Sequence, residues 1–136
     1  MGQSTNASIC YGIPFEDGTE FPWDDFEGFD SWWAELNGLS EPTEEYETNK
    51  ELYSKYWEAK REMEKKCPIE LFTHCSGDYP MYIIGLRGTE QTTYRGEAGE
   101  INPLVAHNPA IITDFLKKYD IEYTQEPKWL LYSYWG

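Results

Sequence analysis

Carboxylate side chains are concentrated in one part of this 136-residue chain, and they are the first candidates for chemistry. The window 16–51 contains thirteen Asp and Glu residues and a single base, Lys50, so it carries −12 of the total net charge of −14. A segment of one charge sign favours a partner surface of the opposite sign. The residues that we predict to bind a partner are Glu16, Asp17, Glu20, Trp23, Asp24, Asp25, Glu27, Asp30, Glu44, Glu45 and Glu47.

Other uses of these carboxylates lack the required spacing. The stretch 24–30 is as rich in acids as a calcium loop, but it lacks alternating oxygen ligands and a final Glu at the right distance. A pair for glycoside hydrolysis cannot be picked out of so many acids. Scattered glycines and the absence of a P-loop lysine give no phosphate cradle. We therefore predict no metal site and no cofactor.

The histidines and cysteines offer one candidate nucleophilic pair. Cys75 and His74 are neighbours in a predicted strand, so their side chains point to opposite faces. Cys75 with His107 remains geometrically open, and it defines an alternative in which the protein is a small cysteine-dependent enzyme. No Cys or His spacing suits zinc. Because no local signature supports a nucleophile, we predict that the protein is not an enzyme.

The sheet that must position these residues is predicted from hydrophobic patterns. Residues 69–75 alternate as a half-buried strand does, and the apolar run 81–86 is typical of a central strand covered on both faces. Residues 91–94 are expected to be a third strand of the same hairpin. An opening strand at 8–15, which Pro14 ends or places at an edge, and an aromatic strand at 128–135 complete the sheet.

Two amphipathic helices and one short helix are predicted between the strands. Asp30 is expected to cap a short helix over 31–36, which Gly38 ends. Thr48 and Glu51 form a predicted capping box before the longest helix. Its apolar stripe is Leu52, Tyr56, Ala59 and Met63, widened by Tyr53 and Trp57. After Asn108–Pro109, a further helix has the stripe Ile112, Phe115, Leu116 and Tyr119.

Aromatic residues alternate with the acids of the window, which indicates a segment that folds onto the body of the protein. Those residues are Phe15, Phe21, Trp23, Phe26, Phe29, Trp32 and Trp33. Burial of several of them gives the segment a hydrophobic reason to fold. We expect Trp33 and Leu36 to be buried anchors, whereas the sequence leaves Trp23 open.

The predicted fold class is α+β. We expect a mostly antiparallel sheet of four or five strands, two main amphipathic helices packed on it, and an acidic, aromatic-rich insertion after the first strand. Residues 1–136 are expected to form a single domain. No signal peptide or membrane span is apparent, so we expect an intracellular protein with Cys10, Cys67 and Cys75 as reduced core residues.

Several short motifs of the chain resemble small acidic accessory proteins encoded by tailed bacteriophages. These motifs are the opening Met1–Ala7, Tyr11-Gly12-Ile13, Gly77-Asp78-Tyr79-Pro80 before the apolar strand, and Tyr94-Arg95-Gly96 after it. The resemblance covers about a third of the chain, and no catalytic residues follow from it. It implies a phage origin and a bacterial cytoplasm, where anti-CRISPR, anti-restriction and gyrase-inhibiting proteins act.

The functional prediction is an inhibitor that binds a basic groove of a bacterial nucleic-acid-binding or defence protein. Carboxylates on a folded scaffold would imitate the phosphates of a duplex, whose charges lie about 1.7 Å apart along the axis. The same field would repel DNA and RNA themselves, so no direct nucleic-acid or membrane partner is expected. The alternative is a non-enzymatic accessory or structural binding module whose acidic face only keeps it soluble.

Overall fold

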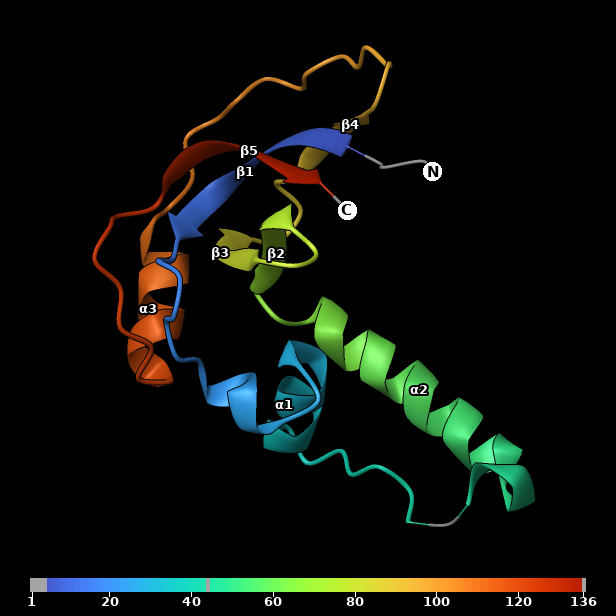
Figure 1. The fold of residues 1–136 in the computed structure, drawn as a ribbon. Helices are drawn as coiled ribbons and strands as arrows, with labels where there is room; N and C mark the ends of the chain where they lie inside the picture. The colour runs from blue at the N-terminus through green and yellow to red at the C-terminus, as the bar shows by residue number, and fades with distance from the viewer. Residues whose placement is uncertain (1–4, 44, 136) are drawn as a thin grey trace. The chain divides into compact units, whose positions relative to one another are not determined.

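The structure is a computed structural model that describes residues 5–43 and 45–135 (Figure 1). It has the predicted α+β fold, with a largely antiparallel five-stranded sheet. The chain divides into two compact units, which we call the strand unit (Met1–Thr19 with Pro68–Gly136) and the helical unit (Glu20–Cys67). The helical unit is the acidic, aromatic-rich insertion that follows the first strand. The single domain remains a prediction, and each unit is described by itself.

The strand unit contains five strands, four of which pair into a closed ring. They are β1 (Thr5–Pro14), β2 (Ile69–Ser76), β3 (Pro80–Leu86), β4 (Gln91–Tyr94) and β5 (Lys128–Trp135). Antiparallel pairing joins β5 to β1, β1 to β3 and β3 to β2, and a short parallel pairing returns from β2 to β5. Strand β4 pairs with the first half of β1, on the edge where β3 pairs with its second half.

The interior of this ring is filled by side chains from several strands. Cys10, Phe72, Ile83 and Tyr132 are buried together, with Leu130 packed against them. Cys10, a small residue of β1, therefore faces the core, and this leaves room for large side chains from the other strands. Hydrophobic burial of this kind is the main force that holds the sheet closed.

Glycine permits the closest strand contact in the ring. Gly12 of β1 pairs with Gly85 of β3. A Cβ atom on Gly12 would lie 2.5 Å from the backbone oxygen of Ile84, and one on Gly85 would lie 2.5 Å from Cε2 of Phe72. Any larger residue would separate the two strands, so these glycines are required by packing rather than by a turn.

Two predictions about the sheet need correction. Strand β1, rather than β3, is the most connected strand, because it pairs with β3, β4 and β5. The third predicted hairpin strand, β4, exists but pairs with β1 instead of β3. Residue patterns identify strands, whereas their order depends on contacts between residues far apart in the sequence.

Helix α3 (Ala110–Lys118) packs on β3 within the strand unit. Its predicted stripe is confirmed, because Ile112, Phe115 and Leu116 are buried. The Oδ1 atom of Asn108 accepts a hydrogen bond from the backbone N of Ala110 at 3.0 Å, so the asparagine satisfies one of the first free amides of the helix.

The helical unit contains α1 (Phe29–Leu36), α2 (Lys50–Lys65) and two short 3-10 turns, η1 (Pro22–Asp25) and η2 (Tyr46–Thr48). Four aromatic side chains, Phe21, Trp23, Phe29 and Trp32, are buried. The rings of Phe21 and Trp23 stack with centroids 4.7 Å apart, and Trp23 meets Phe29 edge-on at 5.0 Å and Trp32 at 5.4 Å. This aromatic core explains how so acidic a segment folds.

Helix α2 is described within its own unit, where it packs on α1 and η2. The indole Nε1 of Trp33 donates to the backbone oxygen of Met63 at 3.0 Å, which ties α1 to the last turns of α2. Within the predicted stripe, Leu52 and Trp57 are exposed, and no residue of α2 is fully buried.

The predicted helix starts also need correction. Gly28 precedes α1, and its φ of 137° is a conformation that favours glycine, so Asp30 lies in the first turn instead. Asn49 caps α2 by accepting from the backbone N of Leu52 at 3.4 Å. Thr48 belongs to η2, where its hydroxyl donates to the backbone oxygen of Glu45. The more local bond of Thr48 therefore replaces the predicted capping box.

Candidate functional site: an acidic pocket in the helical unit

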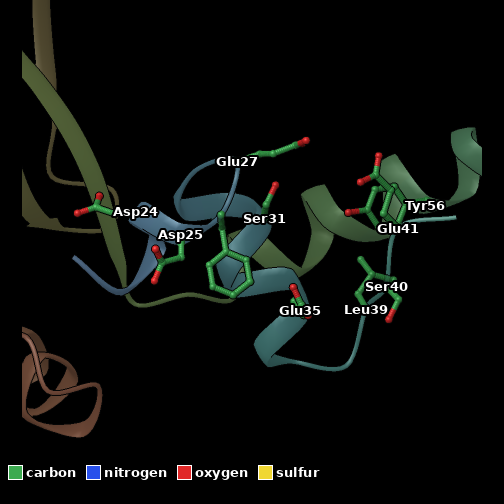
Figure 2. A pocket seen from close by; sticks show the side chains of 10 residues that line it. Asp24, Asp25, Glu27, Ser31, Glu35, Leu39, Ser40, Glu41 and Tyr56 are labelled. Atoms are coloured by element: carbon green, nitrogen blue, oxygen red, sulfur yellow. The ribbon is translucent and has the colours of Figure 1, made fainter. Parts of the chain in front are cut away.

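A pocket of about 530 Å³ in the helical unit gathers a large part of the acidic window (Figure 2). Five carboxylates line it, and none of its described lining residues is basic. The lining side chains are Asp24, Asp25, Phe26, Glu27, Ser31, Glu35, Leu39, Ser40, Glu41 and Tyr56. They come from η1 and α1 on one side and from the segment after α1 and helix α2 on the other.

The turn η1 directs three acids to this surface. The carboxylate of Asp24 accepts a hydrogen bond from the backbone N of Phe21 at 2.8 Å, which closes the turn. Trp23 is only 4% exposed and anchors the turn in the aromatic core. The following residues Asp25, Phe26 and Glu27 are thereby left exposed. One buried indole thus fixes the position of neighbouring charges.

Helix α1 and the segment that follows it contribute further lining residues. Ser31 and Glu35 are four residues apart and therefore share a face of the helix. Gly38 adopts a φ of 86°, and the backbone N of Leu39 donates to the oxygen of Ala34 at 2.9 Å. This left-handed end is the one predicted for Gly38. It turns the chain so that Leu39, Ser40 and Glu41 reach the pocket.

Lys60 of α2 shows how this surface holds a cation. Its ammonium lies 3.3 Å from Oδ2 of Asp30, donates to the hydroxyl of Ser31 at 3.0 Å, and lies 5.8 Å from the ring centre of Tyr56. The Lys60 side chain is 18% exposed and that of Asp30 48%, so the lysine end of this pair is the one shielded from water. Ser31 and Tyr56 also line the pocket, so Lys60 borders it.

The pKa of Tyr56 reflects its burial and the charges around it. Its pKa is raised above 10.0 by burial, and the carboxylates of Glu41, Asp30 and Glu27 raise it further, whereas Lys60 lowers it. The phenol therefore stays protonated at neutral pH and remains able to donate a hydrogen bond. Acids from three separate segments act together on this one hydroxyl.

A second cluster lies along α2 beside more acids. The rings of Tyr46, Tyr53 and Trp57 have centroids 5.6–5.8 Å apart. Tyr46 and Trp57 are 45% and 43% exposed, so part of this aromatic cluster faces solvent. Lys50 lies over the ring of Tyr46 at 5.9 Å. Glu45 and Glu47 flank Tyr46 and are exposed.

The structure separates the predicted binding residues into groups. Asp24, Asp25 and Glu27 line the pocket, and Asp30 lies beside it through Lys60. Glu20 is exposed elsewhere in the helical unit. Trp23 is buried, so it supports the acids from beneath instead of contacting a partner.

The remaining predicted residues lie elsewhere. Glu16 and Asp17 are exposed in the strand unit, in a turn where the hydroxyl of Thr19 donates to the backbone oxygen of Glu16 at 2.7 Å. Glu44 falls outside the described residues.

Sequence reasoning missed several lining residues and misjudged one anchor. Glu35 could have been found from its four-residue spacing to Ser31, but Glu41 and Tyr56 come close only through the turn after α1. Trp33 is half-buried as an anchor, whereas Leu36 is 49% exposed and the prediction for it is wrong. Leu36 ends its helix, where it lacks a neighbouring turn to cover it.

The alternative nucleophilic pair is not assembled. Cys75 pairs with Tyr134 of β5, while the ring of His107 lies 5.7 Å from that of Trp129 on the same strand. Five residues of extended strand separate these two positions, or about 17 Å. Cys75 is also exposed, unlike the buried Cys10 and Cys67, so the prediction of three core cysteines is wrong for Cys75. Its φ of 74° departs from the strand conformation on which the prediction relied.

Comparisons with known proteins do not extend this picture. No protein-family model matches the chain, and no match was found among curated proteins or solved structures. Within residues 5–43 and 45–135, no group of three or more His, Cys, Asp or Glu side chains could hold a metal ion. The helices of this part of the chain are too short or too polar to cross a membrane.

Proposed function

We propose that the protein is a non-enzymatic inhibitor that presents the carboxylates of its helical unit to the basic groove of a bacterial nucleic-acid-handling or defence protein. The observation that supports this proposal is the pocket lined by five carboxylates, two aromatic rings and no described basic residue. Such a surface offers both the charge and the stacking faces that Lys and especially Arg side chains use.

The distribution of charge within the helical unit supports the same proposal. Residues 20–49 contain ten acids and no base, whereas α2 contains five bases and four acids. Helix α2 is therefore nearly neutral, and it neutralises little of the charge of the segment that packs on it. An uncompensated field of this kind steers a basic partner toward the protein and speeds encounter.

The aromatic core gives this charge a fixed arrangement. Phe21, Trp23, Phe29 and Trp32 are buried under the acids and hold η1 and α1 together. A surface that is already ordered loses less conformational entropy on binding than a flexible acidic tail does. This rigidity is what DNA mimicry requires, because phosphates in a duplex also occupy fixed positions.

Anchoring contacts must add affinity to this steering. Phe26 is 38% exposed at the pocket, and Tyr56 forms part of its lining. Lys60 already combines a carboxylate, a hydroxyl and an aromatic face around one ammonium. A Lys or Arg of a partner would find the same three kinds of group in the pocket.

A phage origin is part of the proposal. It is supported by the motif resemblance around Tyr11-Gly12-Ile13 and Gly77-Asp78-Tyr79-Pro80, and it would place the protein in the cytoplasm of a bacterial host. Direct binding of DNA or RNA is not proposed, because the chain carries −14 at neutral pH.

Capture of partners from a bacterial lysate tests the proposal. The wild type is compared with a variant in which the five pocket acids become amides: Asp24→Asn, Asp25→Asn, Glu27→Gln, Glu35→Gln and Glu41→Gln. We expect the wild type to retain a basic nucleic-acid-binding protein that competitor duplex DNA releases. Retention should fall steeply as salt rises, because screening shortens the field to about 8 Å at physiological ionic strength.

A matched control removes five exposed acids from the strand unit. It carries amides at Glu97, Glu100, Asp114, Glu122 and Glu126. Both variants change the net charge by the same amount, so only position distinguishes them. We expect the control to keep the partner and the pocket variant to lose it. Equal retention by wild type, pocket variant and control would show that the acidic face serves solubility alone.

A further inference from the structure

The outer face of three strands in the strand unit, β1, β4 and β5, is not used by the proposed function. Successive residues of a strand point to opposite faces, and Cys10 and Tyr132 point into the ring, where they are buried. Ile9 and Leu131 are directly paired between β1 and β5, so their side chains point outward together. Leu131 is 80% exposed, so it protrudes from this face into solvent.

This outer face carries no charged side chain on its strands. It consists of the odd-numbered residues of 5–11, 91–93 and 129–135, and none of these described residues is Asp, Glu, Lys or Arg. The chain as a whole carries −14, so two copies repel each other wherever their acids face one another. A second copy therefore meets less repulsion at this face than at an acidic surface.

A hollow of about 210 Å³ lies in this face beside Leu131. Its lining includes the small side chain of Ala7 and the apolar side chains of Ile9 and Ile101. Glu100 is the one acid among its described lining residues, and it is exposed. Small-molecule pockets typically begin at about 300 Å³, so a hollow of this size and lining suits one inserted aliphatic side chain.

The segment between β4 and α3 extends this face beyond the strands (Figure 1). The side chain of Gln91 accepts from the backbone N of Asn102 at 2.7 Å and donates to its oxygen at 3.3 Å, and the indole of Trp129 donates to the oxygen of Val105 at 3.1 Å. Ile101 and Val105 of this segment are 68% and 53% exposed.

The size of the face indicates how strongly a second copy would bind. With a rise of ~3.4 Å per residue and a spacing of ~4.8 Å between strands, the paired length of β1 and β5, widened by β4 and the following segment, covers about 500 Å². A standard interface buries roughly 800 Å² per partner, so this face is large enough for a weak, reversible dimer and too small for an obligate one.

We propose that two copies of the chain associate through this face about a twofold axis, with Leu131 of each copy inserted in the hollow of the other. A twofold interface is self-complementary, so it needs a protruding group and a site that receives it on the same surface. Leu131 and the hollow lined by Ala7 provide both. Removal of apolar side chains from water drives the association, and the net charge of each copy opposes it.

Sedimentation velocity at a series of protein concentrations measures this association. We expect a monomer in dilute solution and a dimer with a dissociation constant of about 0.1 mM, as a small interface implies. The dimer should become more stable as salt rises, because screening reduces the repulsion between two acidic copies. The inhibitor contact proposed above weakens with salt, so the two surfaces are tested independently and either one can fail alone.

Substitutions at Leu131 test the face itself. Leu131→Asp removes the inserted side chain and adds a charge, so the dimer should weaken by at least about ten-fold, and Leu131→Ser, which adds no charge, should weaken it by about ten-fold. Ile111→Asp is the matched control, because Ile111 lies on α3 and is 40% exposed. We expect this control to dimerise as the wild type does. Circular dichroism checks that each variant folds.

Nuclear magnetic resonance of the wild type keeps the test decisive if a variant does not fold. The amide resonances of Ile9, Ile101 and Leu131 should shift as protein concentration rises, whereas those of α1 should not. The proposal is overturned if the wild type stays monomeric at the highest concentration in high salt, or if its association weakens with salt. Equal dimerisation of folded Leu131→Asp and Ile111→Asp, or shifts confined to other surfaces, would also overturn it.

Discussion

Replacement of Trp32 by alanine tests whether the acidic surface depends on the aromatic core beneath it. Trp32 is 6% exposed, and its ring lies 5.4 Å from that of Trp23 and 5.8 Å from that of Phe29. The substitution removes no charge and no residue of the acidic pocket. Any loss of partner binding in this variant therefore comes from the scaffold.

The cost of this substitution follows from the buried area. A buried aromatic side chain removes about 150–250 Å² from water, which corresponds to about 4–6 kcal/mol at roughly 25 cal/mol per Å². Residual burial in the unfolded chain reduces this figure. We therefore expect Trp32→Ala to lower the free energy of unfolding of the helical unit by about 3–5 kcal/mol, in the range of other buried Trp truncations.

Urea titration followed by far-UV circular dichroism measures this loss. Trp57→Ala is the matched control, because Trp57 belongs to the same unit but is 43% exposed. We expect the control to lose about 1 kcal/mol. With a slope of about 2 kcal/mol per molar urea, the midpoint of Trp32→Ala should fall by about 2 M and that of the control by about 0.5 M.

Hydrogen exchange locates the effect within the chain. Amides of α1 should lose protection in Trp32→Ala, since their packing on η1 and α2 depends on the aromatic core. The reasoning is refuted if Trp32→Ala and Trp57→Ala have equal midpoints. It is also refuted if α1 keeps its protection in Trp32→Ala.

Three further predictions concern the strand unit. Gly12→Ala should lower the free energy of unfolding by about 1–3 kcal/mol, because the new Cβ would lie 2.5 Å from the backbone oxygen of Ile84. Urea titration measures this loss of stability, and an unchanged midpoint would refute the close contact. Burial lowers the pKa of His74 in the folded state, so the wild type should lose stability as pH falls below 6.5, where the unfolded chain gains a proton first. In thermal denaturation, the stability of His74→Phe should fall less over that pH range than that of the wild type. Equal falls in the two proteins would show that His74 is not the source of the pH dependence. At neutral pH, Cys75 should react with a thiol reagent much faster than Cys10, because Cys75 is exposed and burial raises the pKa of Cys10 to about 12. Equal reaction rates, measured by mass spectrometry, would contradict this difference in burial.

Local patterns predicted most of the elements of the fold. The alternation in 69–75 and the apolar run in 81–86 became β2 and β3, and the stripe with Ile112 and Leu116 became α3. These patterns depend on neighbours within a few residues, so they survive any arrangement of the whole chain. The aromatic residues among the acids likewise predicted a folded insertion.

Properties that depend on distant partners escaped prediction. Pairing of β4 with β1 and closure of the ring through Gly12 and Gly85 join segments that are far apart in the sequence. Three of the predicted binding residues, Asp24, Asp25 and Glu27, line the acidic pocket together because they are close in sequence. Tyr56 was expected only as part of an apolar stripe, and nothing local indicated that it meets Glu41.

The closure of the ring by β5 also sets an order of events during protein synthesis. Strand β1 pairs along most of its length with β5, more than a hundred residues later, and β2 also needs β5 for its parallel pairing. The ring therefore cannot close before the ribosome has translated β5, and such distant pairings fold slowly. The helical unit, by contrast, is a continuous segment, Glu20–Cys67. We expect it to fold on the ribosome while β1 still awaits its partner, so the acidic surface forms first.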